Sequence, residues 1–250
     1  TGGGIVYDSS PHREYRECLL KAAFLVSASR NMHLIETILW TPKDGFFLLD
    51  LHLRRLANSA KFFRFAFNKR YVLQQIHKEA SSFELDFNYR VRLLLANDGA
   101  VSISFQKISP ETSSTVYRAA ISKHKIEPEN IFLYHKTTVR EFYNRAHRRA
   151  VKNGYFDIIF KNKYSEITEG CITNVFIEKD GILCTPPVSC GLLPGVLRKH
   201  LIKAGIAKEK ILTDNDLLSA EKIFLGNSVR GLVQVKIAGS TLDKSVLNFT

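Results

Sequence analysis

EITEGCITNVF, at residues 166–176, decides the fold, because it combines the alternation of a strand with a pair of glutamates. In an extended chain Glu166 and Gly170 share one face, whereas Glu169 points to the other. One carboxylate therefore faces inward among apolar neighbours, where it needs a cationic or hydrogen-bonding partner. Glu169 is the better candidate, since the glycine after it permits the close approach of a flat ligand. A structural ion pair with an arginine is the alternative.

A lysine in the setting of a nucleophile lies upstream, in HKTT at residues 135–138. The apolar run at residues 131–134 predicts a strand that carries Lys136 into the interior. Partial burial lowers the pKa of a lysine, and the neutral amine attacks carbonyl carbon. The alternative is a surface lysine at a strand end.

Downstream, GLLPGVLRKHL at residues 191–201 predicts a loop that ends at Gly195 and a helix that follows it. The unpaired N–H groups of Val196 and Leu197 in the first turn, together with the helix dipole, form an anion site without any basic side chain.

Two further segments supply polar groups for the same anion. FLGNSVRG, at residues 224–231, places Ser228 at a strand end, and HLRRL, at residues 52–56, contains Arg55. An arginine can hold a phosphate through two parallel hydrogen bonds. The sequence therefore predicts an anion site beside the lysine and the carboxylate.

The pattern along the chain predicts an α+β protein of two domains. Helices are expected at residues 50–67, 69–80, 138–153 and 195–204, and strands at 32–40, 88–96, 100–107, 115–122, 156–161, 172–178, 182–185, 222–226 and 232–237. We expect a tail at residues 1–30, an N-terminal α+β domain at 31–122, a linker at 123–130 and a C-terminal α+β domain at 131–250.

Composition excludes several classes of protein. The 250 residues are 45% hydrophobic and 24% charged, as in an ordinary globular protein. No run of about 18 apolar residues occurs and the N-terminus lacks a secretory pattern, so a cytoplasmic location and no membrane contact are expected. The cysteines, at positions 18, 171, 184 and 190, have neither disulfide-framework nor zinc spacing. We expect no metal.

The net charge of +12 raises the possibility of nucleic-acid binding. The basic residues are spread along the chain, however, with one cluster at residues 140–152. On a helix, Arg145 and Arg148 lie opposite Ala146 and Ala150, which is typical of a solvated helix face. An anionic small molecule explains a positive pocket equally well, and we expect no nucleic-acid partner.

Taken in order, the five blocks resemble the fold type IV pyridoxal phosphate enzymes, the group that contains branched-chain aminotransferases, D-amino acid aminotransferases and 4-amino-4-deoxychorismate lyase. The resemblance extends from residue 34 to residue 237. It implies a two-domain α+β fold of the D-amino acid aminotransferase type, a pyridoxal 5'-phosphate cofactor and a homodimer. It also implies that Lys136 is the Schiff-base lysine, that Glu169 binds the ring nitrogen with Asn174 as a structural neighbour, and that Arg55, Val196, Leu197 and Ser228 hold the phosphate.

Within this group, the blocks most resemble lyase domains fused behind aminodeoxychorismate synthase component I. The closest segments are LIETILW at residues 34–40, KTTVREFY at 136–143 and NSVRG at 227–231, and residues 1–30 resemble the end of the synthase's chorismate-binding domain. The resemblance implies a folate-biosynthesis enzyme that converts 4-amino-4-deoxychorismate to 4-aminobenzoate and pyruvate. Lys136 would remove the ring proton before pyruvate is eliminated.

The two carboxylates of that substrate need cations. Arg92 is the first choice, because its neighbours Val91 and Leu93 face the core on the other side of the strand. Arg230 and Thr37 are further substrate-binding candidates, and Arg90, on the same face as Arg92, stays open.

Two other interpretations stay open. A fold type IV aminotransferase, of the branched-chain or D-amino acid type, would share every cofactor residue. A basic binding module without a cofactor would use Lys136 and Glu169 for structure alone.

Overall fold

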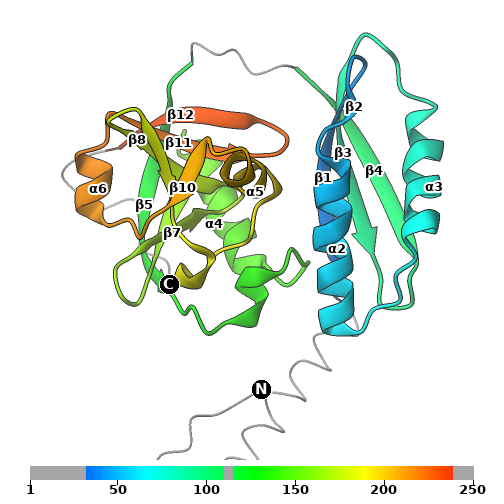
Figure 1. The fold of residues 1–250 in the computed structure, drawn as a ribbon, viewed down its shortest axis with the longest axis horizontal. Coiled ribbons are helices and arrows are strands. Elements are labelled where there is room, and N and C mark those ends of the chain that lie inside the picture. Colours follow the sequence, from blue (N-terminus) through cyan, green and yellow to red (C-terminus); the bar gives the residue numbers. More distant parts are fainter. Residues whose placement is uncertain (1–31, 110–114, 239–250) are drawn as a thin grey trace, which may run out of the picture.

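The structure, a computed structural model, describes residues 32–109 and 115–238. These residues form two units that lie side by side, each with its own β-sheet (Figure 1). Residues 1–30, which resemble the end of a synthase domain, lie outside the described residues.

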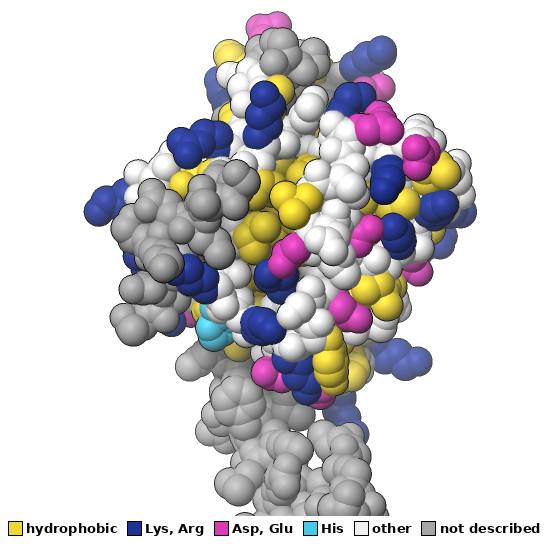
Figure 2. Space-filling view, turned by 90° about the vertical axis from the view of Figure 1, so that its left-hand side faces the viewer, with side chains coloured by type: hydrophobic (Ala, Val, Ile, Leu, Met, Phe, Trp, Pro, Cys, Tyr) yellow, Lys and Arg dark blue, Asp and Glu magenta, His cyan; other side chains and the backbone are white. Residues whose placement is uncertain are grey.

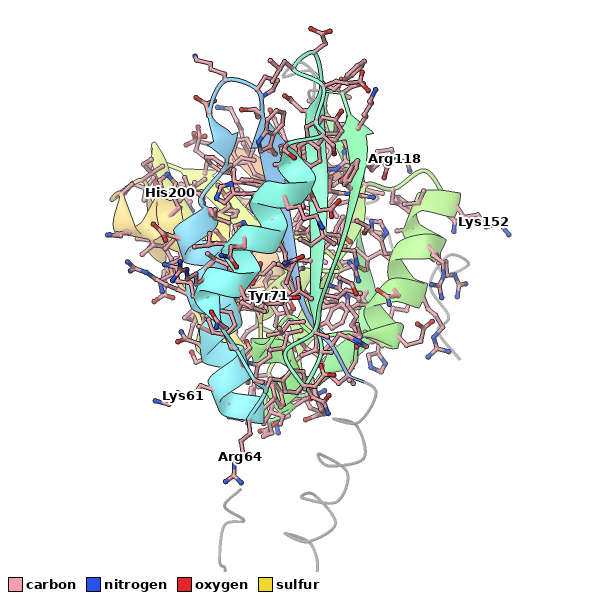
Figure 3. The ribbon with its side chains drawn as sticks, turned by 90° about the vertical axis from the view of Figure 1, so that its right-hand side faces the viewer. Lys61, Arg64, Tyr71, Arg118, Lys152 and His200 are labelled. Atoms are coloured by element: carbon pink, nitrogen blue, oxygen red, sulfur yellow. The ribbon has the colours of Figure 1, made fainter. Side chains whose placement is uncertain are left out.

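The smaller unit is a four-stranded antiparallel sheet with two helices on one face. The strand order is β2-β1-β3-β4. Leu34, Ile38 and Leu93 alternate onto the face that packs against the helices. Figure 3 shows the two helices next to each other on the outside of this unit. The elements are β1 (Leu34–Thr41), β2 (Gly45–Phe46), α2 (Leu49–Phe63), α3 (Lys69–Ala80), β3 (Asn88–Leu95) and β4 (Val101–Ile108).

Local chemistry sets the bounds of these elements close to where the sequence predicts them. The Asn68 side chain accepts a hydrogen bond from Tyr71 N at 3.1 Å and caps α3. The hairpin between β3 and β4 turns at Gly99, which has φ +91° and therefore favours glycine.

The larger unit is built on an eight-stranded sheet in the order β10-β9-β8-β11-β12-β5-β6-β7. Because β7 also pairs with β8, through Glu169 and Asn174, the sheet closes on itself like a barrel. Ile159, Val175 and Leu225 pack in its core. The strands are β5 (Tyr117–Ile126), β6 (Asp157–Asn162), β7 (Ile167–Gly170), β8 (Asn174–Lys179), β9 (Ile182–Thr185), β10 (Ala207–Glu209), β11 (Lys222–Asn227) and β12 (Gly231–Ile237), and the helices are α4 (Glu141–Lys152), α5 (Val196–Lys203) and α6 (Asp214–Leu218).

Two sequence predictions differ from the structure. The strand expected at residues 115–122 belongs to the second sheet, because β5 pairs in parallel with β6 and β12. The chain therefore changes sheets before Tyr117 and not in a linker at 123–130. The apolar run Ile131–Tyr134 is a 3-10 helix instead of a strand, since the Asn130 side chain accepts a hydrogen bond from Phe132 N at 3.1 Å.

The segment that carries Lys136 joins the two units. Ile35 N donates to the carbonyl of Lys136 at 2.8 Å, and Thr138 N donates to the carbonyl of His33 at 2.9 Å. Ser59, on α2, and His135 are hydrogen-bonded at 2.9 Å. The lysine is thus fixed against the edge of the smaller sheet.

Basic side chains on the larger unit are dispersed. Figure 2 shows Lys and Arg interspersed with Asp and Glu on one of its faces. On α4, Arg148 pairs with Glu141 at 2.7 Å, and Lys152 points to solvent (Figure 3). This arrangement is that of a solvated helix face. Within the described ranges, no helix has the length and apolar character needed to cross a membrane.

Candidate active site

A cavity of about 920 Å³ lies between the two units, and Lys136 and Glu169 both line it. Burial, followed by the positive charges of Arg140 and Arg55, lowers the pKa of Lys136 to about 7. A large share of this lysine is therefore a neutral amine near neutral pH, as a nucleophile or a base requires.

Glu169 ends β7 with its carboxylate at the cavity. It is 8% exposed and accepts a hydrogen bond from Leu193 N at 3.0 Å. Burial raises the pKa of this carboxyl to about 7. A cationic N–H donor in the cavity would stabilise the ionised form.

Asp157, for which the sequence carries no signal, fixes the turn that follows Glu169. It is fully buried at the start of β6 and accepts hydrogen bonds from Cys171 N at 2.9 Å, Ile172 N at 3.1 Å and Thr173 Oγ1 at 2.8 Å. A Cβ on Gly170 would overlap this carboxylate. Gly170 is thus needed because the Asp157 carboxylate lies close to it. The sequence had instead suggested that this glycine makes room for a flat ligand.

The start of α5 has the form of an anion site. No side chain caps this helix, so its first N–H groups are available. A Cβ on Gly195 would overlap Oδ1 of Asn174, and Asn174 Nδ2 donates to the carbonyl of Leu193 at 3.0 Å. Val196 lines the cavity. The Leu197 side chain packs in the core instead, which leaves its backbone N–H as the group for an anion.

Arg55 also reaches this corner, but its guanidinium is held by a carboxylate of the protein. Nε and Nη2 donate to Glu36 at 2.9 and 2.6 Å, and Nη1 donates to the carbonyl of Pro194 at 3.4 Å. The sequence predicts that Arg55 donates two parallel hydrogen bonds to a phosphate. In this structure it donates them to the Glu36 carboxylate. Burial alone would raise the pKa of Glu36, but Arg55 and His52 outweigh it and hold the pKa at about 2.

Glu36 had a signal in the sequence. It lies on the same face of the strand LIETILW as the core residues Leu34 and Ile38. A charge at such a position needs a buried partner. The partners come from α2, where His52 Nδ1 lies 2.6 Å from Glu36.

The remaining predicted residues also line the cavity. Ser228 Oγ donates to the carbonyl of Thr37 at 3.4 Å. Thr37 and Arg92 are opposite each other in the register of β1 and β3. Arg90 donates to Gln106 at 2.7 Å, and the Arg230 guanidinium lies 5.5 Å from the centre of the Phe156 ring. The structure thus brings these five side chains to one cavity.

Two polar residues on α4 and its N-cap line the same wall but have no predicted role. Arg140 donates through Nη2 to the carbonyl of Cys171. Arg140 Nε and the Tyr143 hydroxyl are buried and have no hydrogen-bond partner among the described residues. The sequence gives no indication of a role for either residue, because both belong to a stretch whose pattern is typical of a solvated basic helix.

These groups fit pyridoxal 5'-phosphate. Lys136 offers a neutral amine, Glu169 can accept from a protonated ring nitrogen, and the uncapped start of α5 with Ser228 offers donors to a phosphate.

Comparison with known proteins agrees with this assignment. A "Putative aminodeoxychorismate lyase" from Schizosaccharomyces pombe is 29% identical over 79% of this chain and 86% of its own length. A "Probable branched-chain-amino-acid aminotransferase" from Thermotoga maritima is 27% identical over 74% of this chain and 70% of its own. The crystal structure of a "Putative amino-acid aminotransferase" from Mesorhizobium loti is 36% identical and has a TM-score of 0.79, covering 83% of this chain and all of that one.

The α+β architecture of fold type IV, expected from the sequence, is confirmed. The model of the family "Amino-transferase class IV" matches residues 33–238. The chain therefore belongs to the class IV aminotransferases, a family of enzymes that depend on pyridoxal 5'-phosphate.

Proposed function

We propose that this enzyme is an aminodeoxychorismate lyase, which converts 4-amino-4-deoxychorismate to 4-aminobenzoate and pyruvate. The observation that carries the proposal is the charge of the cavity. Arg90, Arg92 and Arg140 line it, and no carboxylate among the described residues forms an ion pair with them. Such a wall suits a substrate with two carboxylates better than a branched apolar side chain. The similarity to the Schizosaccharomyces pombe protein supports the same conclusion.

Each site residue has a role in this reaction. Lys136 would hold the cofactor through its amine and would take the proton from the substrate ring carbon that bears the nitrogen. In the cofactor-free protein, its pKa of about 7 makes the neutral form of the amine available near neutral pH. The same amine can then return a proton to the departing three-carbon fragment.

The cofactor, when bound, supplies an electron-withdrawing ring that stabilises negative charge on the substrate carbon. Glu169 would accept a hydrogen bond from the protonated ring nitrogen, and the first turn of α5 with Ser228 would anchor the phosphate. Arg55 contributes positive charge to the anchor, oriented by Glu36. Arg92 and Thr37, on the smaller sheet, and Arg230, in the turn between β11 and β12 of the larger unit, hold the substrate carboxylates.

A class IV aminotransferase is the second candidate, favoured by the 36% identity with the Mesorhizobium loti protein. Both candidates use the same cofactor residues, so the products must decide between them. We expect purified enzyme, given 4-amino-4-deoxychorismate, to release pyruvate and 4-aminobenzoate in equal amounts without an added keto acid. Transfer of an amino group from branched-chain or D-amino acids to 2-oxoglutarate, with no aromatic product, would contradict the lyase assignment. The homodimer and the link to a synthase stay predictions of the resemblance.

A further inference from the structure

Arg140 lines the cavity, and the described residues satisfy only part of its guanidinium. It is the N-cap residue of α4 and is partly buried, with Nη2 bonded to the carbonyl of Cys171 and Nε without a partner among the described residues. It therefore stands on the wall formed by the larger unit, next to the turn after Glu169.

Arg92 faces the same cavity from the smaller unit. It lies on β3, on the sheet face opposite the helices, and its guanidinium makes no hydrogen bond or ion pair with any described residue. Burial, followed by the charges of Arg140 and Arg90, lowers the pKa of Arg92. The guanidinium groups of the two units are thus within electrostatic range of each other.

None of the acidic residues that line the cavity forms an ion pair with Arg92 or Arg140 among the described residues. Glu141 pairs with Arg148 at 2.7 Å, Glu127 pairs with Lys163 at 3.3 Å, and Glu169 accepts from Leu193 N. The partly buried Arg140 and the more exposed Arg92 carry like charges at one cavity, and a ligand anion between them would reduce their repulsion.

We propose that Arg140 is a substrate-binding residue, which together with Arg92 holds one carboxylate of the substrate from the two units. The inference rests on the proposed function for the identity of the substrate, while the carboxylate site itself follows from the two arginines. A guanidinium binds a carboxylate through directed hydrogen bonds, which a lysine in the same place cannot fully replace. Arg140 thereby selects for a carboxylate at a fixed distance from Lys136.

The test measures binding of a carboxylate against its neutral carboxamide to the cofactor-loaded enzyme. The probe pairs are 4-aminobenzoate with 4-aminobenzamide, and 4-methylpentanoate with 4-methylpentanamide. The variants are Arg140→Met, Arg92→Met and the double variant, with Arg145→Met as the control because Arg145 is exposed on the same helix and outside the cavity. Arg140→Lys keeps the positive charge but removes the directed hydrogen bonds of the guanidinium, so it separates the two contributions.

We expect Arg140→Met and Arg92→Met each to reduce the preference for the carboxylate by about 10- to 100-fold, as for a hydrogen bond to a charged group. The double variant should lose less than the product of the two factors, because both arginines hold the same group. Arg140→Lys should fall between Arg140→Met and the native enzyme, and Arg145→Met should match the native enzyme.

Three results would overturn the inference: an unchanged preference in Arg140→Met, the same loss in Arg145→Met, or a loss of affinity for pyridoxal phosphate with the carboxylate preference intact. If Arg140→Met does not fold, Arg140→Lys and Arg92→Met decide by the same measurement. A preference that depends on Arg140 only for 4-methylpentanoate supports the carboxylate site and contradicts the lyase function. Failure of the carboxylate-site inference and failure of the lyase function therefore give different results.

Discussion

At the scale of single residues, Lys136 and Glu169 are held near their neutral forms by burial in the same cavity. The pKa values of both lie at about 7, reached from opposite directions. Each charged form needs a partner that the described residues do not fully supply. A ligand with a protonated ring nitrogen would pair with the Glu169 carboxylate, and its carbonyl carbon would react with the Lys136 amine.

The pKa of Lys136 predicts an unusual reactivity. In the cofactor-free protein, we expect the rate of amine modification at Lys136 to rise with pH around a midpoint near 7, because the neutral amine is the nucleophile. Lys163 is an internal control, since Glu129 raises its pKa. Peptide mass spectrometry after brief reductive methylation across a pH series measures both lysines in one sample. A midpoint for Lys136 near that of the exposed lysines would contradict the burial seen here.

Glu36 orients Arg55, and Glu36→Gln tests this role. The substitution removes one charge of a buried pair and turns an amide toward the guanidinium, so we expect a loss of about 3–5 kcal/mol in the free energy of unfolding. The affinity for pyridoxal phosphate should fall as well, because Arg55 is no longer fixed beside Pro194. Urea unfolding and titration of the visible absorbance measure the two effects.

Asp50→Asn is the matched control for Glu36→Gln. Asp50 lies on α2 and pairs with Lys69 at 3.2 Å, with both side chains exposed. Such a pair contributes about 0–1 kcal/mol. Equal effects of the two substitutions would mean that Glu36 has no special role in the site.

At the scale of elements, the sequence specifies those whose signals are local. The caps and turns around α3 and the β3–β4 hairpin follow from Asn68 and Gly99, and the start of α5 follows from the Pro194-Gly195 pair. The strand assignment failed at residues 131–134, because an apolar run does not distinguish a strand from a short helix. The membership of β5 could not be predicted, since its partners lie far along the chain.

The turn before α5 predicts a specific clash. Gly195→Ala would push its Cβ into Oδ1 of Asn174, so we expect destabilisation of about 1–3 kcal/mol and weaker binding of pyridoxal phosphate. Asn174→Ala removes the obstructing oxygen. The double variant should therefore be more stable than the sum of the two single changes predicts. Strict additivity in thermal unfolding would show that the two residues do not meet.

At the scale of the whole molecule, the site exists only where the two units meet. The smaller unit contributes Thr37, Arg55 and Arg92, and the larger unit contributes Glu169 and Val196. Sequence blocks identified most of these residues, because each block has a chemical signature of its own. Arg140 and Asp157 were not identified, since their roles depend on which strands and turns the closed sheet brings together.

The shifted pKa values of Lys136 and Glu169 also make the stability of the cofactor-free protein depend on pH. Between pH 4.5 and about 7, Glu169 binds its proton more tightly in the folded than in the unfolded chain, so stability falls as pH rises. Between about 7 and 10.5, the unfolded chain holds the Lys136 proton more tightly, so stability rises with pH. These groups therefore place a minimum near pH 7, where the cofactor should stabilise the protein most.

Thermal unfolding of the native protein and of a Lys136→Met/Glu169→Gln variant across this range measures the contribution of the two groups. We expect the stability difference between the two proteins to have its minimum near pH 7 and to flatten when pyridoxal phosphate is added to the native protein. A difference that does not vary with pH would mean that neither group is buried as described. In that case the cavity would be open to water, and Lys136 would have no advantage over other lysines as a nucleophile.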